Sequence, residues 1–176
     1  GDLVNIVPAD VRLETYVRAK TIDAVVGANE KVNRALKAGA YAVGAEVEIN
    51  EIPGYMPLEQ DPTLSHLFAE NIQSFIGREN IIEGVDLTGS ADAGDVSLIM
   101  PTLHPTVGGF SGNAHSKDFK ITDPEMAYMI PAKAMALTVV DLLFDEAKLA
   151  KEIKSKFKPS FTKESYLKFW DELIKQ

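Results

Sequence analysis

The sequence predicts an α/β chain in which a strand–helix–strand unit is followed by a mainly helical region. Residues 11–18 and 45–52 alternate apolar and polar side chains with a period of two, as half-buried strands do. Between them, residues 21–43 carry apolar side chains at the spacing of an amphipathic helix. Two prolines and a glycine at residues 53–57 then mark a connector, and helical periodicity resumes beyond it.

The first unit is expected to contain one long helix between its two strands. Thr21 is predicted to cap the N-terminus of the helix, because its hydroxyl can accept a hydrogen bond from a backbone amide of the first turn. Gly44 is predicted to end the helix, and Pro8 separates strand 11–18 from a preceding apolar run of edge-strand type. A strand–helix–strand unit of this size is not expected to be stable without more sheet.

The rest of the chain is predicted to hold four helices and one short strand. Asp61 caps the first of these helices, with Pro62 at its first position and Gly77 at its end. Pro131 would clash inside a helix, so a turn is expected before a helix that starts there. The expected elements are helices over residues 62–76, 131–144, 146–157 and 163–175, and a strand in "VSLIMP" at residues 96–101.

The composition argues against several classes of function. Apolar residues make up 45% of the 176 residues, enough for a hydrophobic core, so general disorder is not expected. A formal net charge of −8 opposes attraction to nucleic acid or to an anionic membrane. The absence of cysteine excludes disulfides and thiolate metal sites, and no membrane span or export signal is expected. These observations favour a cytoplasmic protein without nucleic-acid or membrane partners.

The stretch "GSADAGDVSLIMPTLHPTVGGFSGNAHSKDF", residues 89–119, is glycine-rich and has little helical or strand period. Structureless stretches of this length in compact domains are usually functional, or else they contain an element that the sequence pattern does not reveal. His115 is either a surface histidine in a loop or a neutral imidazole that binds a cation or acts as a base. His104, held extended before a proline, either lines the same cleft or has a structural role.

Four other residues of this stretch are candidates for a binding role. Asp92 and Asp95 suit either turns and helix caps or a carboxylate site. Gly108 and Gly109 either allow a ligand to approach the backbone closely or are ordinary turn glycines. No phosphate-binding glycine loop and no serine nucleophile elbow is present in the sequence. A catalytic zinc ion takes about three protein ligands, so if His115 is a ligand, its companions must come from outside this chain.

Three stretches, in this order, resemble the C-terminal part of the metal-dependent amidohydrolase and peptidase family: "GSADAGDVSLIMPTLHPTVGG", "AHSKDF" and "AKAMALTVVDLLFDEAKLAKEIKSKF". This family includes aminoacylases, carboxypeptidase G and, most similar to this chain, the p-aminobenzoyl-glutamate hydrolase subunits. "VNIVPADVRLETYVRAKT" is similar to the middle of the family's lid, or dimerisation, domain. The resemblance extends over nearly the whole chain, up to about residue 157.

The resemblance implies a partial ferredoxin-like lid at residues 1–54, followed at residues 55–176 by the C-terminal part of an α/β metallohydrolase catalytic domain. Family members hydrolyse the amide bond of an N-acyl amino acid, a dipeptide or p-aminobenzoyl-glutamate, with two Zn²⁺ or Mn²⁺ ions that activate water. The lid mediates dimerisation, so a homo-oligomer is expected.

The resemblance also assigns roles to residues. His115 matches the last metal ligand of the family. Asn5 and Arg18 match lid positions that bind the substrate carboxylate, a task that suits the planar fork of Arg18. The segment around Asp92 and the Gly108–Gly109 turn match loops that flank the cleft, where the two glycines are expected to contact substrate.

The family's remaining catalytic residues have no counterpart in this sequence. These are a His-x-Asp ligand pair, a bridging acidic residue and a Glu-Glu pair that holds the general base. We therefore expect a chain that is inactive alone, either a fragment of a longer enzyme or a subunit completed by the missing N-terminal half. The alternative is a non-catalytic binding or assembly module that associates through the edge of its strand–helix–strand sheet.

Overall fold

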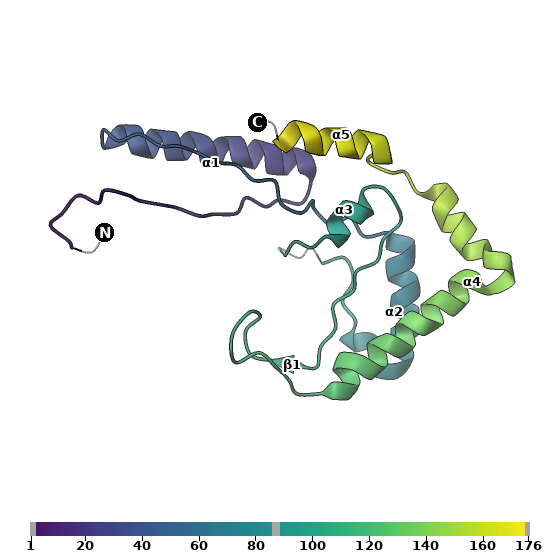
Figure 1. Ribbon diagram of the computed structural model, residues 1–176. Helices are drawn as coiled ribbons and strands as arrows, with labels where there is room; N and C mark the ends of the chain where they lie inside the picture. The colour runs from purple at the N-terminus through teal and green to yellow at the C-terminus, as the bar shows by residue number, and fades with distance from the viewer. Residues whose placement is uncertain (1–2, 86–88, 175–176) are drawn as a thin grey trace. The chain divides into compact units, whose positions relative to one another are not determined.

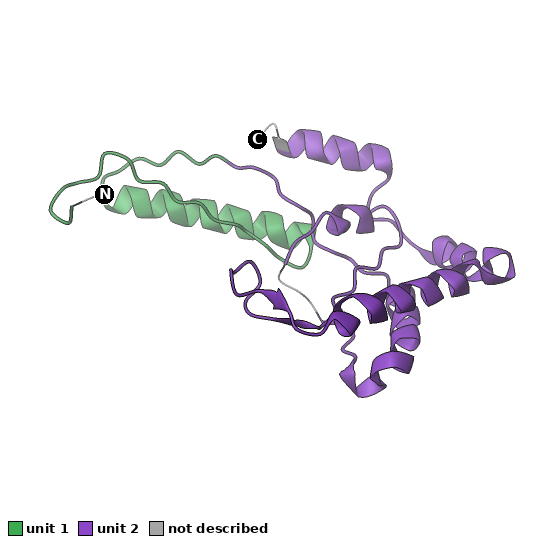
Figure 2. Cartoon of the chain, turned by 60° about the horizontal axis from the view of Figure 1, so that its bottom comes forward, with its two compact units in different colours: residues 1–50 green, residues 51–176 purple. Residues whose placement is uncertain are grey.

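The computed structural model describes residues 3–85 and 89–174. The chain divides into two compact units, residues 1–50 and 51–176, which are coloured separately in Figure 2. Each unit is described by itself below.

The long helix of the first unit is α1, Ile22–Ala42, which confirms the helix predicted for this stretch. Thr21 has extended backbone angles, and its Oγ1 accepts a hydrogen bond from the amide of Ala24 at 3.3 Å, so the predicted cap is present. Gly44, with φ 71°, follows the last turn in the left-handed conformation that glycine favours. No side chain of α1 is buried.

The two predicted strands of this unit are not formed among the described residues. Residues 11–18 and 45–50 are irregular in Figure 1, with no ladder partner. Val11 and Leu13 on the would-be core face are 78% and 70% exposed. A period-two pattern specifies which face of a strand is buried, but a strand forms only where a second strand supplies hydrogen bonds. The α/β fold class therefore remains a prediction.

The second unit is organised around a pair of packed helices, α2 (Pro62–Ile76) and α4 (Ile130–Lys156), which lie side by side in Figure 1. Asp61 Oδ1 accepts hydrogen bonds from the amides of Thr63 and Leu64, each at 2.9 Å, and Gly77 ends α2 with φ 79°. The predicted start and end of this helix are thus confirmed. The core between the helices consists of Phe68, Ile72 and Ala134, flanked by Ile76, Ile81, Leu103 and Ile130.

Helix α4 has an irregular start and an internal break. A π-helical turn, η2 (Glu125–Met129), precedes it, and Pro131 lies in its first turn, where a missing amide leaves no hydrogen bond unmade. Phe144 has extended backbone angles, and residues 145–147 have φ between 51° and 59°, so the helix is broken there. The sequence placed a helix boundary at this point, and the structure agrees.

The prediction of a strand in "VSLIMP" is wrong. This part of the chain forms the short helix α3 (Ala93–Ser97), followed by the fully buried Leu98. A short apolar run does not distinguish a buried strand from a buried helical turn. The other elements are the 3₁₀ turn η1 (Arg78–Asn80), the strands β1 (Phe110–Ser111) and β2 (Lys120–Ile121), and α5 (Lys163–Ile174). Helix α5 confirms the last predicted helix, whose residue 175 lies outside the described residues.

Candidate functional site

His115 lies at the tip of a small antiparallel hairpin. Strands β1 and β2 pair in register, Phe110 opposite Ile121 and Ser111 opposite Lys120. The rings of Phe110 and Phe119 stack with their centroids 5.2 Å apart and their planes 8° apart. This ring pair closes the base of the loop that carries the histidine.

The backbone of the His115 loop is fixed by short-range hydrogen bonds. The amide of Ser116 donates to the carbonyl of Asn113 at 3.1 Å, and the amide of Asp118 donates to Ser116 Oγ at 3.2 Å. His115 itself has φ 62°, a left-handed conformation that is uncommon outside glycine, although asparagine, aspartate and histidine adopt it more often than other residues. Its side chain is exposed. The loop therefore holds the histidine at the surface in one defined backbone conformation.

The two glycines before the hairpin differ in what their surroundings require. Gly109 has φ 93°, and a Cβ there would lie 2.6 Å from the Asp123 carbonyl oxygen, so a side chain cannot be accommodated. Its own carbonyl accepts hydrogen bonds from the amides of Thr122 at 2.9 Å and Asp123 at 3.1 Å. At Gly108 a Cβ would make only ordinary contacts with Met126. Close backbone packing thus explains Gly109, whereas the predicted substrate-binding role of both glycines stays a prediction.

Of the two aspartates in this region, Asp95 is the one with partners. Asp92 is exposed at the start of α3 and makes no capping hydrogen bond with its side chain. Asp95 Oδ1 accepts a hydrogen bond from the hydroxyl of Tyr166 at 2.6 Å, and Oδ2 accepts one from the amide of Met56 at 3.4 Å. Trp170 Nε1 in turn donates to the Tyr166 hydroxyl. Asp95 therefore connects α3 to α5 and to the connector before α2.

Tyr166 was not singled out from the sequence, although it shares this region with Asp95. The pKa of Tyr166 is raised from 10.0 to about 12. Burial is the larger cause, and the hydrogen bond to Asp95 is the next. The sequence signal that could have identified it is the spacing of Tyr166 and Trp170, four residues apart on one face of the predicted last helix. Two aromatic side chains with polar tips at this spacing are suited to a partly buried polar cluster.

The other predicted site residues are His104 in the second unit and Asn5 and Arg18 in the first unit. His104 is exposed, and its amide donates to Gln60 Oε1 at 2.9 Å. Asn5 and Arg18 belong to the first unit and are exposed, with the Arg18 guanidinium 4.9 Å from the centroid of the Tyr16 ring. A planar guanidinium stacked on a ring keeps its donors available for a carboxylate.

A metal ion needs more ligands than these residues supply. A structural or catalytic zinc needs three or four ligands drawn from histidine, cysteine, aspartate and glutamate. Within residues 3–85 and 89–174 no three such side chains gather in a way that could hold a metal ion. The described residues therefore do not fit a metal centre on their own, and a metal bound at His115 needs further ligands from outside them.

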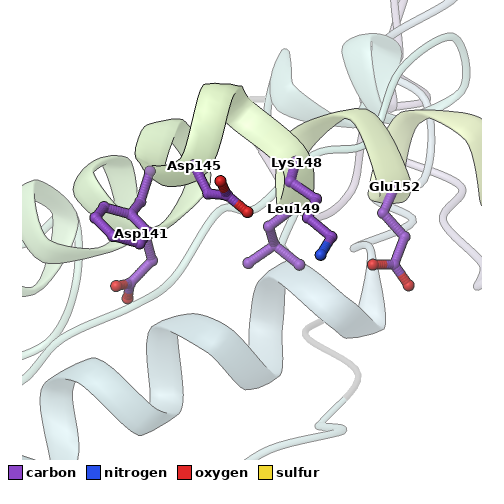
Figure 3. Close-up of a pocket in the computed structure, with 6 residues that line it drawn as sticks. Asp141, Asp145, Lys148, Leu149 and Glu152 are labelled. Carbon is purple, nitrogen blue, oxygen red and sulfur yellow. The ribbon is translucent and has the colours of Figure 1, made fainter.

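An open hollow in the described surface lies at the break in α4. It encloses about 250 Å³ and is lined by Asp141, Phe144, Asp145, Lys148, Leu149 and Glu152 (Figure 3). None of the predicted site residues lines it. The hollow follows from the change of direction in the helix, and its mixed charges are those of a solvated surface.

Comparison with known proteins supports a relationship to peptidases. No family model and no solved structure matches the chain. The chain is similar to the Xaa-Arg dipeptidase of Mus musculus, with 28% identity over 173 residues, and to the Xaa-Arg dipeptidase of Homo sapiens, with 26% identity over 173 residues. Each alignment covers 93% of this chain but only 39% of the relative. The chain thus spans well under half the length of these two relatives.

Proposed function

We propose that this chain is the C-terminal part of a metal-dependent amidohydrolase that hydrolyses the amide bond of a dipeptide, an N-acyl amino acid or a p-aminobenzoyl-glutamate-like substrate. The observation that supports this proposal is the similarity to two Xaa-Arg dipeptidases over 93% of the chain. We further propose a cytoplasmic enzyme that uses Zn²⁺ or Mn²⁺ and forms a homo-oligomer through residues 1–54.

His115 is the residue of this chain that we assign to the metal. A neutral imidazole at the surface is a good ligand for a divalent ion. Within the described residues no hydrogen bond or ion pair engages the His115 side chain, and its loop is preorganised by its own backbone. One histidine is too few, so the other ligands and the general base are proposed to come from polypeptide that corresponds to the unmatched part of the relatives.

Arg18 and Asn5 are proposed to bind the carboxylate of the substrate. The exposed guanidinium of Arg18 can offer two parallel N–H groups to a carboxylate. Stacking on Tyr16 limits the conformational freedom that Arg18 would lose on binding. Asn5 can add an amide hydrogen bond to the same group.

A second candidate function is supported by the first unit alone. Residues 11–18 have backbone amides and carbonyls without a ladder partner among the described residues. Such an edge is a template for pairing with another strand. On this alternative, the chain is a non-catalytic assembly module that adds a strand to a partner and performs no hydrolysis.

The experiment that separates these candidates is reconstitution. The chain is produced together with the polypeptide encoded immediately upstream of it, and hydrolysis of arginine-ending dipeptides and of p-aminobenzoyl-glutamate is measured with added Zn²⁺ or Mn²⁺. Metal-dependent hydrolysis is expected only when both polypeptides are present. Assembly without hydrolysis of any of these substrates would favour the non-catalytic alternative.

The matched variants are His115→Asn and Lys117→Gln in the same loop. Asparagine tolerates the left-handed backbone of position 115, so this change removes the imidazole while preserving the loop conformation. Hydrolysis should fall by on the order of 100-fold or more in His115→Asn and stay close to its starting value in Lys117→Gln. Equal turnover in the two variants would refute the assignment of His115 as a ligand.

A further inference from the structure

Helix α4 is apolar on two opposite sides, and only one of them is covered. The covered side faces α2 and contains the buried residues Ala134 and Thr138. The other side forms a continuous surface along η2 and the first half of α4, which we call the α4 stripe. Its members are Tyr128, Met129, Ala132, Met135, Ala136, Val139, Val140 and Leu143. A helix that is apolar all round is normally buried on all sides.

The α4 stripe is large enough to form the centre of an interface. Its six large side chains are between 51% and 62% exposed. Together they present on the order of 500 Å² of apolar surface, compared with roughly 300–600 Å² for the largest patch on an ordinary soluble monomer. A standard protein interface buries about 800 Å² per partner, with its most apolar part at the centre.

The charged residues of this half of α4 lie off the stripe. The Lys133 ammonium is 5.7 Å from the centroid of the Phe75 ring of α2, and Asp141 Oδ2 accepts a hydrogen bond of 2.8 Å from Asn71 Nδ2 of α2. Both contacts belong to the side packed on α2. A partner for the stripe must therefore be apolar, because a charged surface would lose its hydration without gaining an ion pair.

A membrane is the less suitable occupant, although the stretch Glu125–Lys156 is long and apolar enough to cross one, with an 18-residue window of mean hydropathy 1.5. A spanning helix must satisfy its backbone hydrogen bonds within the bilayer over about 20 residues. The stretch before the break at residues 145–147 has about that length, but it contains the charged side chains of Lys133 and Asp141, which are costly to place in a bilayer. The side-chain amide of Asn71 in α2 adds a further polar group beside α4, where it donates a hydrogen bond of 3.2 Å to Thr138 Oγ1.

We propose that the α4 stripe is the docking surface for the polypeptide that corresponds to the unmatched part of the dipeptidase relatives, an inference that rests on the proposed function. The chain covers 39% of these relatives, so more than half of their length has no counterpart here. A folded complement of that size has apolar sheet or helix faces to bury. The stripe is an exposed apolar surface among the described residues of the second unit, and it fits such a face.

The test uses the absence of cysteine from the natural sequence. Val139→Cys and Ala136→Cys each introduce a single thiol on the stripe, and Lys154→Cys introduces one at an exposed position of the second half of α4. Maleimide labelling rates are measured for the chain alone and with the upstream polypeptide. Labelling at positions 139 and 136 should slow at least tenfold in the complex, whereas the rate at position 154 should stay unchanged. Circular dichroism confirms that each variant is folded.

Three results would overturn the proposal. Unchanged labelling at both stripe positions in a complex that forms would show that the partner binds elsewhere. Protection that increases with the concentration of the chain alone would identify a second copy as the occupant. Protection by phosphatidylcholine–phosphatidylglycerol vesicles without the polypeptide would identify a membrane.

The same samples separate this inference from the proposed function. Hydrolysis without protection of the stripe would retain the function and reject the docking surface. Protection without hydrolysis would retain the docking surface and reject the function.

Discussion

The hydroxyl of Tyr166 in α5 donates a 2.6 Å hydrogen bond to Oδ1 of Asp95 in α3. These residues are 71 positions apart in sequence, and the bond joins the last helix to the glycine-rich stretch that carries the candidate site residues. A second bond ties the same region together, from the amide of Phe161 to the carbonyl of Leu98 at 3.2 Å. Helix α5 therefore supports the position of α3.

Replacing Tyr166 by phenylalanine should destabilise the second unit. The variant removes a hydrogen bond to a carboxylate that is partly buried, which costs about 1–3 kcal/mol. Urea denaturation should show this loss in the free energy of unfolding. Tyr41→Phe is the control, because Tyr41 is 87% exposed, and its effect should stay within about 0.5 kcal/mol. Equal stability of the two variants would mean that the bond to Asp95 contributes nothing.

Stability should also depend on the ionisation of Tyr166 at high pH. Its pKa is raised from 10.0 to about 12 in the folded chain, because burial and Asp95 both disfavour the phenolate. Folding therefore favours the neutral phenol of Tyr166. Its contribution to the free energy of unfolding is complete below about pH 10 and is lost as the pH rises through about 12. Tyrosinate absorbance should show a late-titrating step that is missing in Tyr166→Phe. A titration curve identical in the two proteins would contradict this.

Gly94→Ala should be markedly destabilising. A Cβ at Gly94 would lie 2.0 Å from the carbonyl oxygen of Met56, so α3 and the connector could not remain in contact. Overpacking against backbone costs about 1–3 kcal/mol or more. Gly27→Ala in the middle of α1 is the matched control, since nothing lies within 4 Å of the added Cβ. It should stabilise α1 by about 0.5–1 kcal/mol, and thermal unfolding of both variants checks the opposite signs.

Glu146→Gly should stabilise the break in α4. Glu146 has φ 56°, a conformation that costs a non-glycine residue about 1–2 kcal/mol and costs glycine almost nothing. The same change at Lys151, within the regular helix that follows, should destabilise the chain by about 1 kcal/mol. Calorimetric unfolding of the two variants measures the difference. A loss of stability in both would show that position 146 prefers the right-handed helix in solution.

The sequence predicted those elements whose signals are local. Asp61, Pro62 and Gly77 mark the ends of α2 within a few residues of the groups they satisfy, and the structure has the helix between them. The strand at residues 11–18 depends on a partner that no local pattern specifies, and no ladder forms there among the described residues.

The residues of the candidate site also differ in whether a local sequence signal identifies them. His115 could be selected from the sequence because its surroundings are aperiodic and glycine-rich. The bond between Tyr166 and Asp95 could not, because it joins residues that only tertiary packing brings together. The role of Gly94 is also hidden, because the backbone that excludes a side chain there belongs to Met56, far earlier in the chain.

Charged side chains beside the unpaired segments of the first unit would restrict which strand could pair with them. On the polar side of residues 11–18 stand Arg12, Glu14 and Arg18, whereas the polar side of residues 45–50 carries Glu46 and Glu48. Opposite charges directly across a strand pair attract and like charges repel. A strand that pairs with either segment would thus need side chains of complementary charge. A shift of one residue in the pairing register would misalign every charge pair. On the assembly-module alternative, these segments would select both the identity and the register of the strand that joins them.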